Sequence, residues 1–154
     1  MGSSRWFPLR RLRSALALDR DELLLSLQAI GDLVVARVAI ATLGFARIRG
    51  ALESTRPGRP RTSGYPMAVR RAVARAARTV PGSRCLPQAI VAFRLLRRGA
   101  HPAEFTLGVR RRDGAGAPLH AHAWVRSGAL IVTGDSGDTD IAHYTTLAHI
   151  RNGP

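Results

Sequence analysis

The chain contains no lysine, a single cysteine and few aromatic side chains. One cysteine excludes an internal disulfide, so the fold must depend on non-covalent packing alone. Aromatic residues make up only 5% of the chain. Because RNP, zinc-finger and helix-turn-helix patterns are also missing, we expect no nucleic-acid partner. The amino-terminal residues lack the charge-then-apolar layout of a signal peptide, which favours the cytoplasm.

The longest apolar stretch is too short to indicate a membrane protein. Residues 33–45 are strongly apolar, but Arg37 interrupts them, and a helix needs about 20 apolar residues to cross a bilayer. We therefore expect a helix that is buried against the core, and no membrane contact. Contact between the arginine-rich amino-terminal segment and a membrane surface is the lesser alternative.

Positive charge dominates the sequence. All 24 basic residues are arginine, only 10 residues are acidic, and the formal net charge is +14. One interpretation is a solvated basic surface without a specific role. The other is an acidic partner, because a strong positive field steers negatively charged chains toward the protein.

The hydrophobic patterning predicts a single α+β domain over residues 1–154, which is an ordinary length for one domain. Asp19 and Glu22 have the spacing of a capping box at the start of a helix that runs to about Arg49. The Pro- and Gly-rich residues that follow predict an exposed loop before the core begins. The domain therefore divides into a helical amino-terminal part, a loop and a core, at residues 1–53, 54–64 and 65–150.

The expected core combines two helices with a small antiparallel sheet. Helical patterns cover residues 65–79 and 85–98, and alternating apolar residues at 103–111 predict a strand. A second alternating segment and its hairpin partner complete the sheet. The pattern is poor from residue 137 onward, where Tyr144 is expected to cover a sheet edge.

The cysteine lies at a predicted helix start. A turn at Pro81 and Gly82 precedes Cys85, an apolar helical pattern follows it, and Pro87 fits only in a first helical turn. Unpaired N–H groups and the helix dipole stabilise a thiolate at such a position, and Arg84 adds a positive charge. The pattern is typical of a nucleophile, although a lone cysteine is also commonly an inert, buried residue.

A candidate base lies downstream, in a segment that alternates as a strand does. The period of two places His120, His122 and Trp124 on one face of residues 119–125. A nucleophilic cysteine needs a neighbouring base, and histidine has the right proton affinity for this role. Packing in the core is the default role for Trp124.

A hairpin supplies the candidate third residue. If Ser127 and Gly128 form the tight turn, His122 lies opposite Thr133. Asp135 is then a diagonal neighbour of His122, about 7–8 Å away on the same face. A carboxylate there can orient the imidazole. A metal site built from the two histidines with Cys85 or Asp135 is the chemical alternative, although a lone His-x-His is weak evidence.

These motifs together resemble a known family. The sequence Cys-Leu-Pro-Gln-Ala at a helix start, Leu-Leu-Arg-Arg-Gly after it, a strand ending Leu-Gly-Val-Arg, and His-Ala-His-Ala-Trp-Val are similar to the leader peptidases of lasso-peptide biosynthesis. These enzymes are transglutaminase-like, papain-like cysteine proteases. The resemblance covers residues 80–135. It implies that the nucleophile's helix packs on a small antiparallel sheet, and that Cys85, His122 and Asp135 form a catalytic triad.

The resemblance also implies partners. Family members cut the leader peptide from a ribosomally made precursor, and a lasso cyclase then closes the core peptide. The chain is similar to the stand-alone peptidases, which act with a separate leader-recognition (PqqD-like) protein. No cofactor or metal is implied. Two other functions stay open: a transglutaminase-type acyl transferase with the same triad, and a non-enzymatic basic binding module.

Overall fold

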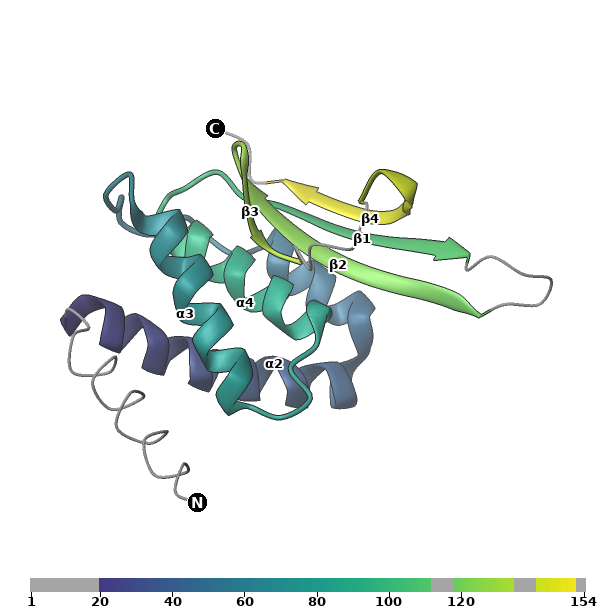
Figure 1. Ribbon diagram of the computed structural model, residues 1–154, viewed down its shortest axis with the longest axis horizontal. Helices are drawn as coiled ribbons and strands as arrows, with labels where there is room; N and C mark the ends of the chain where they lie inside the picture. The colour runs from purple at the N-terminus through teal and green to yellow at the C-terminus, as the bar shows by residue number, and fades with distance from the viewer. Residues whose placement is uncertain (1–19, 112–117, 135–140, 152–154) are drawn as a thin grey trace, which may run out of the picture.

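Three helices lie against one side of a four-stranded antiparallel sheet in the computed structural model, which describes residues 20–111, 118–134 and 141–151 (Figure 1). The strand order is β3-β2-β1-β4. The α+β class expected from the sequence is therefore confirmed. In chain order the elements are α2 (Arg20–Glu53), α3 (Tyr65–Thr79), α4 (Cys85–Arg98), β1 (Glu104–Arg111), β2 (Leu119–Ser127), β3 (Leu130–Thr133), a short 3₁₀ helix (Ile141–His143) and β4 (Thr145–Arg151).

The helix α4 occupies the centre of the molecule. It contacts α2 and α3 on one side and strands β1, β2 and β3 on the other. The sequence predicted one apolar face on this helix, but the structure also buries Val91, Ala92 and Leu95 completely. Phe93 packs edge-on against Phe105 of β1, with 6.3 Å between the ring centroids. Burial on both sides of α4 leaves its amino-terminal end with little freedom to move.

The helix α2 is longer than predicted and is bent. It continues to Glu53, and the bend lies at Gly44, whose φ of 72° and ψ of 164° are not helical. By length and composition alone, α2 is long and apolar enough to span a membrane. The apolar stretch at residues 33–45, which the sequence analysis considered, was too short. Ala29 and Leu33 are fully buried in the same core as α3 and α4, but Val35 and Val38 are more than half exposed, so the helix expected to be buried against the core is buried only in part.

The sheet differs from the sequence-based prediction in two respects. First, β4 was missed: it pairs with β1, with Ile150 opposite Phe105. Second, the predicted hairpin register was wrong. The turn consists of residues 128–129, so Ser127 pairs with Leu130. A bulge between Val125 and Arg126 then shifts the register again. As a result, Thr133 lies opposite Val125 rather than His122. The positive φ of 59° at Gly128 explains why the turn begins there.

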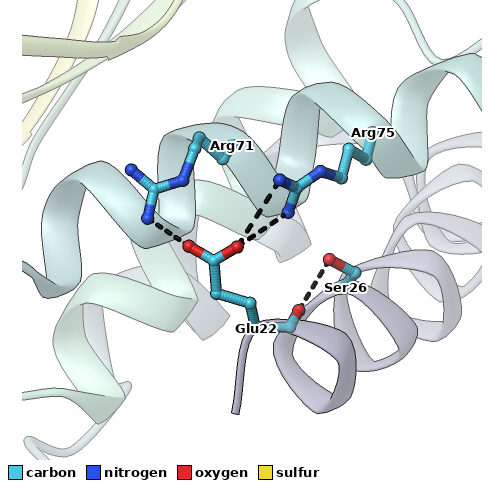
Figure 2. A network of polar contacts seen from close by, with 4 residues as sticks. All are labelled: Glu22, Ser26, Arg71 and Arg75. Carbon is cyan, nitrogen blue, oxygen red and sulfur yellow. Dashed lines mark hydrogen bonds and ion pairs between the residues drawn. The ribbon is translucent and has the colours of Figure 1, made fainter. Parts of the chain in front are cut away.

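An ionic contact ties the start of α2 to α3. The Glu22 carboxylate accepts hydrogen bonds from Arg71 and, at 3.4 Å, from Arg75 (Figure 2). One turn along α2, the Ser26 hydroxyl donates to the Glu22 carbonyl at 2.8 Å. The sequence had assigned the Glu22 side chain to a capping box with Asp19, which lies outside the described residues. The carboxylate instead joins two helices that are distant in sequence.

We expect the substitution Glu22→Gln to reduce the pH dependence of stability. The hydrogen bond from Arg71, helped by the positive charges of Arg71 and Arg75, holds the pKa of Glu22 below its ordinary value of 4.5. A carboxylate with a lowered pKa stabilises the fold above its ordinary pKa, and this contribution is lost as the pH falls through the lowered value. Glu22→Gln should therefore unfold at lower urea than the wild type at pH 7, and the difference should close in acid.

Urea midpoints at pH 7, 5 and 3 measure this difference. Glu53→Gln is the control, because Glu53 pairs only with Arg49 one turn away, with both side chains about half exposed. Such pairs contribute about 0.3–0.5 kcal/mol. A Glu22→Gln deficit that stays constant from pH 7 to pH 3 would contradict the role of the carboxylate charge.

Candidate functional site

Cys85 is the first residue of α4, as the sequence predicted. Arg84 precedes the helix with extended backbone, and the free thiol is partly buried beside the apolar core. The backbone N–H groups of a first helical turn have no partner within the helix, and Pro87 carries no N–H. The N–H groups of Cys85 and Leu86 can therefore serve an anion at this helix end.

The turn before Cys85 is held by a residue from α2. Arg37 donates a hydrogen bond to the carbonyl of Pro81. Gly82 has a φ of 71°, and a Cβ atom there would lie 3.0 Å from the Arg37 guanidinium, so the turn requires glycine. The sequence marked Arg37 only as an interruption of an apolar stretch. In the structure it anchors the loop that leads to Cys85.

The side chain of Gln88 has a structural contact. Its Nε2 donates to the carbonyl of Ser83 at 2.6 Å, across the start of α4. Gln88 therefore helps to fix the loop geometry around Cys85.

His122 is buried on β2 and is oriented by a backbone carbonyl. Its Nε2 lies 2.8 Å from the carbonyl oxygen of Gly134. A carbonyl can only accept a hydrogen bond, so Nε2 carries the proton and Nδ1 keeps its lone pair. A φ of 89° and a Cβ position only 2.8 Å from the Ala123 carbonyl oxygen explain why residue 134 is glycine. The contact therefore leaves Nδ1 as the unprotonated nitrogen of the neutral imidazole.

The sequence predicted that Tyr144 only covers a sheet edge, but the structure places it against the histidines of β2. Its ring centroid lies 5.7 Å from that of His122 and 6.0 Å from that of Trp124. Its hydroxyl lies 2.8 Å from Nδ1 of His120. Trp124 stacks on His122 with 6.0 Å between centroids. The predicted shared face of the two histidines and Trp124 is confirmed, and Tyr144 covers it.

Gly108 makes room for this aromatic cluster. It pairs with His122 across the β1–β2 ladder. A Cβ atom at this position would lie 2.9 Å from Cβ of Tyr144 and 3.1 Å from the Trp124 ring. Arg110, two residues further along β1, places its guanidinium 5.4 Å from the Tyr144 ring centroid. No local sequence signal marked Gly108, because its neighbour Tyr144 lies 36 residues away in the chain.

Cys85 lies at the start of α4 and His122 lies on β2. Among the described residues, no hydrogen bond links the Cys85 thiol to His122. Cys85 packs on the core to which Ala123 and Val125 of β2 belong, whereas His122 lies with Trp124. Because side chains alternate along a strand, His122 and Trp124 lie on the face of β2 opposite Ala123 and Val125. Asp135, the predicted third member, lies outside the described residues, directly after Gly134.

The alternative of a metal site finds no support in the described residues 20–111, 118–134 and 141–151. Within them, no group of three His, Cys, Asp or Glu side chains is arranged to hold an ion. His120 is bound to Tyr144 and His122 to a backbone carbonyl. The remaining histidine on the sheet, His149, pairs with Thr106 at 3.0 Å.

Comparison with known families matches residues 32–149 to the transglutaminase-like superfamily. Because the match covers most of the chain, the protein belongs to this superfamily, whose members are usually cysteine-based enzymes. The match begins inside α2 and so extends well before the motif-bearing residues 80–135. No curated protein and no solved structure matches the chain.

We expect Gly108→Ala to destabilise the protein by about 1–3 kcal/mol, the usual cost of overpacking a core. The new methyl group would force Tyr144 or the Trp124 ring away from the histidines. Gly31→Ala is the matched control, because no atom lies within 4 Å of the added methyl group and its helical backbone favours alanine. Urea denaturation measures both. Equal stability of the two variants would show that Gly108 does not set the aromatic packing.

Proposed function

We propose that this chain is a cysteine peptidase that removes the leader from a ribosomally made lasso-peptide precursor. The observation that carries the proposal is Cys85 at the start of the central helix of a transglutaminase-like domain. The motifs around Cys85 and His122 add the resemblance to leader peptidases. The residues support acyl chemistry because they combine a thiol, free N–H groups and a basic imidazole nitrogen.

In the proposed mechanism, the Cys85 sulfur attacks the scissile carbonyl carbon and forms a thioester as the peptide C–N bond breaks. Nδ1 of His122 takes the thiol proton and delivers it to the departing amine. Water then attacks the thioester, His122 takes a proton from the water, and the thiol receives it back. The N–H of Cys85 stabilises the oxyanion in both steps. Asp135, next to Gly134, is proposed to orient His122 as the third member of the triad.

We expect Cys85→Ala to abolish cleavage and His122→Ala to slow it by about 10²–10⁴-fold, the usual contribution of a general base. His120→Ala should cost less, because His120 bonds Tyr144 rather than the Gly134 carbonyl. Mass spectrometry of the precursor after incubation measures the three rates. Cleavage by Cys85→Ala at the wild-type rate would refute the peptidase, and a larger loss at His120 would exchange the roles of the histidines.

The second candidate, a transglutaminase-type acyl transferase, is favoured by the name of the superfamily that the chain matches. It would use the same thioester and differ only in the acceptor, an amine in place of water. Product masses distinguish the two, because transfer adds the mass of the amine and hydrolysis adds that of water. Supplying a primary amine with the precursor therefore decides between them.

We propose that a leader-recognition protein presents the substrate and that a cyclase acts on the product, all in the cytoplasm. Addition of the recognition protein should then raise the cleavage rate by about 10²–10⁴-fold, through a higher effective concentration of leader near Cys85. Rates with and without this protein, over a range of salt concentrations, measure the effect. A chain that is fully active alone would contradict the two-protein system. Loss of the rate gain at high salt would indicate docking through exposed arginines.

A further inference from the structure

A groove opens beside the bend of α2, away from Cys85 and His122. It lies between the second half of α2 and the middle of α4, with a volume of about 220 Å³. Its floor is apolar and includes Ala39, Ile48, Leu52 and Ile90. The bend at Gly44 turns the two parts of α2 relative to each other, and the groove extends across this bend. A cavity of this size accepts an aliphatic side chain.

Among the described residues that line the groove, two are charged: Arg47 from α2 and Arg94 from α4. Within the ranges that the structure describes, neither guanidinium has an ion pair or a hydrogen bond, and Arg94 is half-buried. Other arginines nearby are paired: Arg49 with Glu53, and Arg98 with Asp32. Two unpaired cations beside an apolar cavity favour a ligand that brings carboxylates, because partial burial strengthens such a pair.

The groove continues into an exposed apolar strip of α2. Val35 and Leu43 line the groove and are about half exposed, at 56% and 50%. Val38, at 57%, and Val34, at 47%, extend the apolar surface along the helix. Exposed aliphatic residues in a contiguous group are typical of interaction surfaces rather than of free surface. The ligand therefore combines acidic groups with aliphatic side chains.

We propose that this groove binds an acidic peptide segment of a partner protein, with an aliphatic side chain in the cavity and carboxylates on Arg47 and Arg94. The concave shape fits a side chain better than the flat headgroup layer of a membrane. A second copy of this chain is disfavoured by the net charge of +14, which makes two copies repel. Arg94 lies nine residues after Cys85 on α4, so the docked segment sits about 14 Å along the helix from the thiol.

The binding experiment needs no catalytic activity, so its failure and the failure of the peptidase proposal are separate. The probe is a short fluorescein-labelled peptide of Glu-Glu-Leu repeats, and fluorescence anisotropy measures its affinity for the full chain carrying Cys85→Ala. The double variant Arg47→Gln, Arg94→Gln should weaken binding by about tenfold or more, because it removes both charges that would hold the carboxylates of the peptide. Ala51→Trp, which fills the groove from an exposed position, should weaken it similarly.

Matched controls separate the groove from general charge. Arg78→Gln removes an exposed arginine at the end of α3, outside the groove, and should change affinity less than about twofold. Peptides with Gln for Glu, or Ser for Leu, should bind about tenfold more weakly than the probe. Circular dichroism confirms that each variant is folded.

Several results would overturn the proposal. They are the absence of saturable probe binding, an equal loss with Arg78→Gln, and equal binding of the Gln peptide. Binding to phosphatidylglycerol vesicles that the groove variants reduce, without peptide binding, would assign the surface to a membrane instead. A dimer in sedimentation that Ala51→Trp dissociates would assign it to a second copy.

Discussion

The burial of α4 on both sides is the constraint on which the rest of the structure depends. Helices α2 and α3 press on one side of it and the sheet on the other, so the helix can neither slide nor turn without opening the core. Its first residue is therefore held at a fixed place, and that residue is Cys85. Arg37 and Gln88 then fix the loop before it. A reactive thiol needs such support because small displacements of a nucleophile cost large factors in rate.

On the face of the sheet that carries His122, two glycines shape the site because they have no side chain. Gly108 leaves space for Tyr144, and Gly134 brings its carbonyl to the His122 ring. Both glycines lie where a methyl group would strike backbone or aromatic atoms. The imidazole is consequently buried against the rings of Trp124 and Tyr144 and held in one tautomer by the Gly134 carbonyl, which suits its proposed role as a base.

The arginines of this chain fall into distinct groups in the structure. Some join helices, as Arg71 does with Glu22 and Arg98 with Asp32. Arg37 supports the loop before Cys85. Arg47 and Arg94 have no partner within the described residues and flank an apolar groove. The net charge was compatible with a solvated basic surface or with an acidic partner, and the groove at Arg47 and Arg94 is where we propose that such a partner binds.

The sequence by itself determined the local features of the protein. Helices α3 and α4 run over residues 65–79 and 85–98 as predicted, because prolines, a Pro-Gly turn and apolar spacing mark helix ends within a few residues. The position of Cys85 at a helix start and the shared face of His120, His122 and Trp124 follow from the same short-range rules.

Only the tertiary structure decided what depends on residues far apart in the chain. The bulge that shifts the hairpin register, the pairing of β4 with β1, the contact of Tyr144 with His122 and the hydrogen bond of Arg37 all join distant segments. Strand pairing and side-chain packing are chosen by the whole core, and a one-residue slip changes which side chains meet. For that reason the period of two along the sequence placed His122 on its strand. Only the folded chain showed that Gly134 and Tyr144 hold its side chain there.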